Sequence, residues 1–324
     1  MVRPVSLPRV AAEAAPSSAR PLPTFSVVIC THNRAALLPR AVGSVLDQTY
    51  RDFELVVVDD GSTDSTAHVV STFDDARVRY VHRENGGLSA ARNTGVEHAG
   101  GRYVVFLDDD DFAFSHWLER FASAVESAPA VVSCGEVVTD DDGEVLRTTL
   151  PGELGPGFAG YEGWFLPGTF VVRRDAYEAA GGFRAGLPHM HQTEFVLRLL
   201  PLCRERGWEV TTIAEPLVQR HAGGDRRVGL ENTRSIYDAM DYIVTQHEDQ
   251  LARSSWLLAQ YSAVAGVAAA RIGDYPAARR HLRRAVRTRP RAGKHWARLA
   301  LASVPPVGRV AWGRARAEKP ESTA

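Results

Sequence analysis

Four consecutive carboxylates follow an apolar run in the stretch Tyr103-Val-Val-Phe-Leu-Asp108-Asp109-Asp110-Asp111. The apolar run predicts a buried strand, and the carboxyl end of a central strand in an α/β sheet is where such folds bind ligands. A divalent cation would relieve the repulsion between the carboxylates, because it takes hard oxygen ligands. The stretch therefore predicts a metal site for a phosphorylated substrate. A solvated acidic turn is the alternative.

Strands and helices alternate around this stretch. The apolar patterns predict strands at 25–30, 53–58, 77–82 and 103–107, and helices at 35–46, 65–73 and 88–98. Such repeated crossovers indicate a mostly parallel sheet flanked by helices, so the fold class is α/β. Two further strands, at 131–138 and 144–148, are expected to form a hairpin after the carboxylates.

Two polar turns leave the same edge of this predicted sheet. The first strand runs into Thr31-His32-Asn33-Arg34, and the second runs into the turn at 59–64. Hydroxyl, imidazole and carboxylate groups should therefore meet the acidic cluster in one crevice suited to a nucleotide. The sequence has no G-x-G-x-x-G after the first strand, no phosphate-binding P-loop motif and no G-x-S-x-G elbow. These absences argue against dinucleotide oxidoreductases, P-loop enzymes and α/β-hydrolases.

Five sequence blocks, in this order, resemble family 2 glycosyltransferases with the GT-A fold. They are Phe25-Ser-Val-Val-Ile-Cys-Thr-His-Asn-Arg34, Ser44-Val-Leu-Asp-Gln-Thr-Tyr50, Phe53-Glu-Leu-Val-Val-Val-Asp-Asp-Gly-Ser62, Asn85-Gly-Gly-Leu-Ser-Ala-Ala-Arg-Asn93 and Leu107-Asp-Asp-Asp-Asp111. The resemblance covers residues 25–221 and implies metal-dependent, inverting transfer from a nucleotide-diphosphate sugar to an acceptor hydroxyl. The acceptor would be a glycan, a lipid-linked intermediate or a small metabolite. A noncatalytic donor-binding or scaffold protein and a nucleotidyltransferase are the alternatives.

The resemblance implies roles for individual residues around the nucleotide. Thr31, His32 and Asp60 stand where the family binds the nucleotide. Arg92 and Asn93 stand where a helix could orient the donor, although polar residues on a helix surface need no ligand.

The resemblance also implies a metal site. Asp108 and Asp110 match the family's D-x-D pair, in which Asp110 would hold Mn²⁺ or Mg²⁺ on the diphosphate and Asp108 would contact the ribose of the donor or share the metal. His221 matches a histidine that in many relatives reaches back to the metal or the pyrophosphate, with a surface histidine in a loop as the alternative. Asp111 ends the family's motif, so it ranks above Asp109 as a further member of the site.

The predicted catalytic base departs from the family pattern. Relatives carry an acidic pair before the helix that contains Arg198, but this chain has His191 and Gln192 there and keeps only the later acid, Glu194. Inverting transfer needs a base that takes the acceptor proton. Glu194 is the first candidate and His191 the second. An ordinary ion pair between Glu194 and Arg198, four residues apart on one helix, is the structural alternative.

The C-terminal hundred residues differ in character from the rest. Helical spacing is expected at 231–247, 254–272, 275–288 and 294–303, and part of this region resembles a single tetratricopeptide-type hairpin. The segment from residue 271 to 319 holds 14 Lys or Arg and two acids, whereas the whole chain has a net charge of −1. A basic helical surface suits peripheral membrane contact or a partner protein, with an ordinary solvated helix pair as the alternative. No nucleic-acid partner is expected.

Four segments follow from these patterns. We expect a disordered leader at 1–24, a GT-A domain at 25–228, a helical extension at 229–304 and a basic flexible tail at 305–324. The chain has 324 residues, no apolar run long enough to span a membrane and three widely spaced cysteines. A cytoplasmic location is expected, with peripheral contact to the membrane as an addition.

Overall fold

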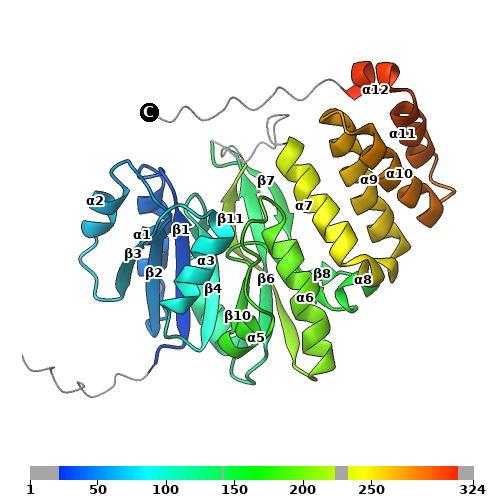
Figure 1. Cartoon of the computed structure of the whole chain (residues 1–324). Coiled ribbons are helices and arrows are strands. Elements are labelled where there is room, and N and C mark those ends of the chain that lie inside the picture. The colour runs from blue at the N-terminus through cyan, green and yellow to red at the C-terminus, as the bar shows by residue number, and fades with distance from the viewer. Residues whose placement is uncertain (1–21, 141, 223–232, 313–324) are drawn as a thin grey trace, which may run out of the picture.

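The computed structural model describes residues 22–140, 142–222 and 233–312. In these ranges nine strands form one mixed sheet, in the order β3-β2-β1-β4-β10-β6-β11-β5, with β7 paired to β6 (Figure 1). The strands are β1 (Phe25–Thr31), β2 (Phe53–Asp59), β3 (Val78–His82), β4 (Tyr103–Asp108), β5 (Phe112–Ala113), β6 (Val131–Thr139), β7 (Val145–Thr149), β10 (Phe170–Arg173) and β11 (Val210–His221). A small separate pair joins β8 (Gly152–Glu153) to β9 (Glu162–Gly163).

Helices cover both faces of the sheet. The helices of the α/β region are α1 (Leu38–Leu46), α2 (Thr66–Ser71), α3 (Leu88–Glu97), α4 (Trp117–Ala124), α5 (Arg174–Ala179) and α6 (His191–Glu205), and Pro156–Phe158 forms a 3₁₀ turn. Alternate residues of β1 enter two cores: Val27 packs with α1 and α4, and Val28 packs with α3, α5 and α6. Because both faces are buried, β1 is apolar along almost its whole length.

The first four strands are parallel neighbours, as the sequence predicted. β1 lies between β2 and β4, and β3 pairs with β2. The carboxyl ends of β1, β2 and β4 therefore meet at one edge, which carries the two polar turns and the acidic cluster. The predicted α/β class and mostly parallel sheet are confirmed.

The second half of the sheet departs from simple crossovers. β10 runs antiparallel between β4 and β6, while β11 is parallel to β6 and antiparallel to the short β5. The predicted hairpin is present as the antiparallel pair β6–β7. One residue of its turn, Asp141, lies outside the described residues.

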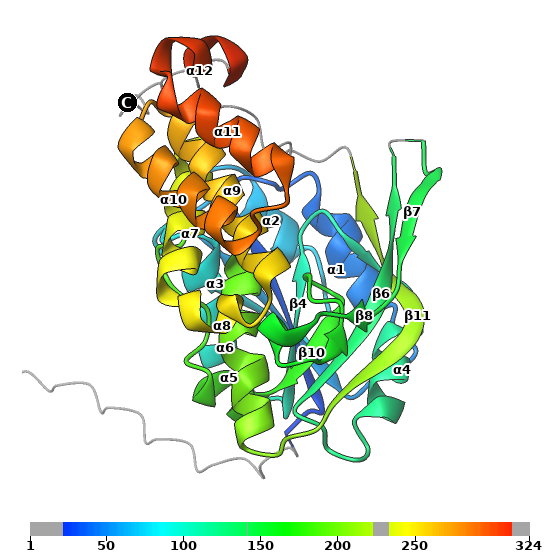
Figure 2. The same cartoon turned by 90° about the vertical axis from the view of Figure 1, so that its right-hand side faces the viewer.

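The chain continues into a helical region beside α6 (Figures 1 and 2). Its helices are α7 (Thr233–Gln246), α8 (Glu248–Ala252), α9 (Ser255–Arg271), α10 (Tyr275–Thr288), α11 (Gly293–Ser303) and α12 (Pro305–Trp312). The α9 and α10 helices form a hairpin, and the Asp274 side chain caps α10 by accepting from the Ala277 N–H at 3.0 Å. Leu197 of α6 packs in one cluster with Ile243 and Leu251, which joins the two regions.

The structure differs from the predicted start of the flexible tail. The predicted flexible tail begins at residue 305, but residues 305–312 form α12, so that part of the prediction was wrong. Two adjacent prolines at the start of α12 suit the first turn of a helix. The remainder of the tail, from 313, and residues 1–21 of the predicted leader lie outside the described residues.

Gly95 sets how closely α3 approaches the sheet. A Cβ atom added at this position would lie 2.3 Å from Val28 Cγ1 in β1. We expect Gly95→Ala to destabilise the fold by about 1–3 kcal/mol, because the core cannot take the extra methyl group without moving α3. Gly43→Ala is the matched control, since a Cβ atom there meets nothing within 4 Å and alanine favours the helix by up to about 1 kcal/mol. Urea unfolding of both variants measures the difference, and equal stability would contradict this account.

Candidate active site

A cavity of about 280 Å³ opens at the carboxyl ends of β1, β2 and β4. Its lining residues are Cys30, Thr31, His32, Arg34, Asp60, Leu88, Ala91, Asp108 and Asp109. Four residues predicted from the sequence, Thr31, His32, Asp60 and Asp108, therefore line the same cavity. The volume lies near the lower end of the range for small-molecule sites.

Three carboxylates of the acidic turn converge beside this cavity. One side-chain oxygen from each of Asp108, Asp110 and Asp111 can be chosen so that all lie within 4.8 Å of one another. Asp109 and Asp111 are 5% and 1% exposed, so a solvated turn does not describe these two residues. Three hard oxygen donors at this spacing fit Mg²⁺ or Mn²⁺.

Two arginines balance part of this negative charge. Arg34 donates from one nitrogen to Asp109 at 3.0 Å and to Asp110 at 3.1 Å, and Arg92 donates to Asp108 at 2.8 Å. Burial raises the pKa of Asp109, and the Arg34 charge opposes that rise. No role was predicted for Arg34. A cation three residues after Thr31 was a usable signal, because the turn that holds it was expected at the same sheet edge as the acidic cluster.

Arg92 lies in the wall of the site. Its side chain is almost fully buried, and its guanidinium lies 5.2 Å from the centre of the Phe183 ring. With the Gln192 amide oriented to accept, its oxygen takes hydrogen bonds from both terminal nitrogens of Arg92, at 2.7 and 3.0 Å. Arg92 thus links Asp108 of β4 to the first turn of α6.

Asn93 holds a loop rather than facing the cavity. Its amide nitrogen donates to the Phe183 carbonyl at 2.8 Å, and its oxygen accepts from the Tyr177 hydroxyl at 2.6 Å and the Phe183 N–H at 2.9 Å. These contacts favour the reading of Asn93 as a structural residue over contact with the donor.

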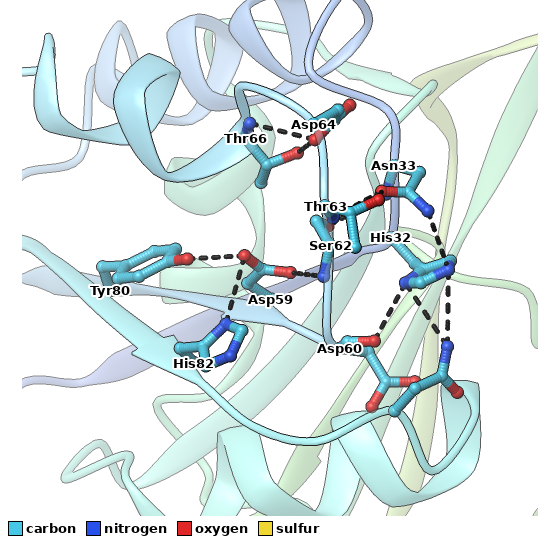
Figure 3. A network of polar contacts seen from close by, with 11 residues as sticks. His32, Asn33, Asp59, Asp60, Ser62, Thr63, Asp64, Thr66, Tyr80 and His82 are labelled. Carbon is cyan, nitrogen blue, oxygen red and sulfur yellow. Dashed lines mark hydrogen bonds and ion pairs between the residues drawn. The ribbon is translucent and has the colours of Figure 1, made fainter. Parts of the chain in front are cut away.

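The two polar turns are tied together by hydrogen bonds (Figure 3). His32 Nδ1 donates to the Asp60 carbonyl at 2.9 Å, and its Nε2 then accepts from the Asn33 amide at 3.1 Å. Behind them, Asp59 accepts from the Ser62 N–H at 2.7 Å and from the Tyr80 hydroxyl. Burial favours a higher pKa for Asp59, but the hydrogen bonds outweigh it and lower the pKa.

The Asp60 side chain anchors the turn before α3. Its two oxygens accept from the Gly86 N–H at 3.0 Å and the Gly87 N–H at 2.8 Å, and Arg83 forms an ion pair with it. Asp60 thus lines the cavity and also holds the loop before α3 in place. The Arg83 contact could not be predicted from the sequence, because it depends on the path of that loop.

The two base candidates have different surroundings. Glu194 is 1% exposed and receives two hydrogen bonds from Arg198, at 2.8 and 2.7 Å, with His247 Nε2 at 3.4 Å. Burial would raise the pKa of Glu194, but His247 and Arg198 outweigh it and hold the pKa at about 2. These contacts favour the ion-pair alternative for Glu194.

His191 is the first residue of α6 and is partly buried. Burial, together with repulsion from Arg92, lowers the pKa of His191 to about 4. The imidazole is therefore neutral at pH 7 and able to accept a proton.

His221 ends β11 near the acidic turn. Val218 pairs with Ala113 and Gln219 with Phe112 in the antiparallel β5–β11 ladder. β5 directly follows the acidic turn, and His221 itself pairs with Thr139 of β6. In the described part of the chain, the group of side chains close enough to share a cation consists of the three carboxylates and does not include this histidine.

Comparison with known proteins identifies the family. Residues 26–186 match the family described as glycosyl transferase family 2. The uncharacterized glycosyltransferase EpsJ of Bacillus subtilis (strain 168) is 34% identical over 136 residues, which are 41% of this chain and 39% of EpsJ. The match thus spans well under half the length of that relative.

Two solved structures share the fold. Residues 1–349 of S. aureus TarS, in complex with UDP-GlcNAc, align with a TM-score of 0.59 and 16% identity over 90% of this chain and 92% of that one. The mannosyltransferase PcManGT from Pyrobaculum calidifontis, in complex with GDP-Man and Mn²⁺, aligns with a TM-score of 0.50 and 20% identity over 90% and 88%. The coverage means that the likeness in fold extends into the helical region.

A mostly parallel sheet with an acidic cluster at the carboxyl end of β4 defines a GT-A nucleotide-sugar-binding domain. The chain belongs to glycosyl transferase family 2, with a helical C-terminal region. The resemblance of the five sequence blocks is confirmed. None of the helices in the described ranges combines the length and apolar character that a membrane span requires.

The environment of Glu194 predicts a specific response to pH. We expect Glu194→Gln to lower the free energy of unfolding by about 3 kcal/mol at pH 7, because Arg198 loses its buried partner. The pKa of Glu194 is lowered from 4.5 to about 2, so this stabilisation is present above pH 4.5 and disappears as the pH falls toward 2. Urea unfolding at neutral and acidic pH measures it.

Glu178→Gln provides the control, since Glu178 is an exposed glutamate on α5. Its effect should be small at every pH. A Glu194→Gln protein as stable as the wild type at pH 7 would remove the structural role assigned to this carboxylate.

Proposed function

We propose that this protein transfers a sugar from a nucleotide-diphosphate donor to an acceptor hydroxyl, with inversion at the anomeric carbon. The observation that carries the proposal is the convergence of Asp108, Asp110 and Asp111 beside a cavity that Thr31, His32 and Asp60 also line. The structural neighbours, TarS in complex with UDP-GlcNAc and PcManGT in complex with GDP-Man and Mn²⁺, agree with this class of donor.

The three carboxylates would hold Mn²⁺ or Mg²⁺. When bound, such an ion neutralises charge that grows on the departing diphosphate. His32 and Asp60 shape the nucleotide end of the cavity, because their mutual hydrogen bond joins the two polar turns. Arg92 keeps the Asp108 side chain in place from the protein side. In this proposal His221 is a further contact to the metal or diphosphate, supported by its place at the end of β11, which pairs with β5 directly after the acidic turn.

We assign the catalytic base to His191 and a positioning role to Glu194. The acceptor hydroxyl must lose a proton as its oxygen attacks the anomeric carbon, and the neutral His191 imidazole can take it. Glu194 is poorly suited because Arg198 occupies both of its oxygens, and its low pKa gives it little tendency to bind a proton. The Arg198 guanidinium in turn donates to the Gly182 carbonyl at 2.7 Å, so the pair supports the loop before α6.

The donor site is tested by thermal shift with uridine, thymidine, guanosine and cytidine diphosphates, each with Mn²⁺ and with chelator. At a hundred times Kd, a nucleotide that binds should add about 2.7 kcal/mol, a shift of a few degrees. We expect one base to give a Mn²⁺-dependent shift that Asp110→Asn abolishes. Asp74→Asn, at an exposed aspartate after α2, should keep it. No shift with any nucleotide would favour the scaffold alternative.

The base assignment predicts a split between binding and turnover. We expect His191→Gln to slow release of nucleoside diphosphate from the donor sugar by about 10²–10⁴-fold, with the thermal shift retained. His191→Glu, which restores an acid at this position of the family pattern, should recover much of the rate. In the wild type the rate should fall as the pH drops through the pKa of His191. Full activity of His191→Gln together with an inactive but folded Glu194→Gln would assign the base to Glu194.

A noncatalytic donor-binding protein remains the second candidate. The observation in its favour is the replacement of the family's acidic pair by His191 and Gln192. A donor that binds with Mn²⁺ but is not turned over by the wild type would support it. The family match argues against a nucleotidyltransferase.

A further inference from the structure

A stripe of arginines runs along α10. Between residues 275 and 303 the chain has nine Lys or Arg and no Asp or Glu. Four of these, Arg280, Arg283, Arg284 and Arg287, have the spacing that places residues on one side of a helix. They line a groove of about 520 Å³, which we call the arginine groove, together with Glu248, Leu258, Pro276 and Thr288.

The arginine groove has more positive charge than its own carboxylates neutralise. Arg280 pairs with Asp241 at 2.9 Å, and Arg284 pairs with Glu248 at 2.8 Å. Within the described residues, Arg283 and Arg287 form neither an ion pair nor a side-chain hydrogen bond. Like charges one turn apart destabilise a helix, so α10 keeps both residues at a cost in stability. An anionic ligand that entered the groove would offset this repulsion.

Exposed tryptophans lie at the same end of the helical region. Trp296 is 53% exposed, and its indole donates to the Pro290 carbonyl at 2.8 Å, two residues beyond the end of α10. Trp256, 55% exposed, lies in the first turn of α9, which the antiparallel hairpin brings beside the end of α10. The α10 and α11 helices lie on the side of the extension remote from the sheet (Figure 1).

We infer that the arginine groove and its two tryptophans form a docking site for an anionic membrane surface. The arginines would bind lipid phosphate groups, and the indoles would lie at the level of the headgroups, where tryptophan is favoured. Cations alone would suit any soluble anion or an acidic protein. Exposed indoles at the same end of the helical region favour the membrane, because they bury apolar area on binding.

The proposed docking site is narrower than the basic surface predicted from the sequence. The sequence alone placed the basic surface within the whole segment from residue 271 to 319. The side chain of Arg309 and all of residues 313–324 lie outside the described residues, whereas the α10 stripe and the groove are formed by described ones.

The test is flotation of the full chain with vesicles of phosphatidylglycerol and phosphatidylcholine, and with vesicles of phosphatidylcholine alone. We expect binding to the anionic vesicles only, weakened by salt. Replacing both Arg283 and Arg287 by Ala should weaken it by about 25-fold, since each basic residue near an anionic surface contributes about a fivefold effect. Replacing both Trp256 and Trp296 by Ala should remove the binding that survives at high salt.

The matched control replaces Arg102 and Arg206, two exposed arginines of the α/β region, by Ala. It changes the net charge equally and leaves residues 313–324 in place, so it should retain vesicle binding. Equal weakening by both arginine pairs, or no binding to anionic vesicles, would overturn the inference. Binding to polyglutamate as tight as to vesicles, unaffected by the tryptophan changes, would instead assign the groove to an acidic protein. Circular dichroism verifies that α10 is intact in each variant.

Discussion

The repulsion among the carboxylates at the end of β4 is the constraint on which the site depends. Two unit charges 4 Å apart repel by about 4 kcal/mol at an effective dielectric of 20, and burial prevents water from screening them fully. Two arginines from different elements reduce this repulsion. Arg34 arrives from the turn after β1 and Arg92 from α3, and each donates to the acidic turn. The approach of α3 to the sheet, which requires the missing side chain at Gly95, is therefore part of the electrostatic balance of the site.

Sequence patterns predicted the elements whose side chains are buried on a regular period. The first four strands lie within one or two residues of their predicted bounds, because each is an apolar run between polar turns. The carboxyl ends of parallel strands must meet at one edge, so Thr31, His32, Asp60 and Asp108 could be placed together before any geometry was known. No comparable rule predicts contacts that depend on the path of a loop. The pairing of Asp60 with Arg83 and the hold of Asn93 on the loop near Phe183 are of this kind.

The residues of the site divide between the cavity and its supports. Asn93 on α3 and Arg198 on α6 both bind backbone groups of the loop between α5 and α6. A resemblance to family motifs cannot distinguish residues that support the loop from residues that line the cavity, because both kinds belong to the same motifs. Position separates them: His32 and Asp108 line the cavity, whereas Asn93 and Glu194 are not among its lining residues and bind other parts of the protein. His191 and Gln192, which replace the family's acidic pair, therefore lie in the first turn of α6, and the contacts of Arg198 hold this helix in place independently of them.

The helical extension reaches this same helix. His247, which precedes α8, approaches Glu194, while Leu197 packs among Ile243, Leu251 and neighbouring residues of α7 to α9. In addition, the Gln250 amide donates to the Gly157 carbonyl at 2.9 Å, so α8 also touches the segment between β8 and β9. Since His191 begins α6 and Glu194 lies in its first turn, any shift of the extension would be transmitted to the residue proposed as the base. The extension is thus part of the framework of the active site, and a surface on its outer side can hold the catalytic cavity at a fixed orientation to whatever it docks against.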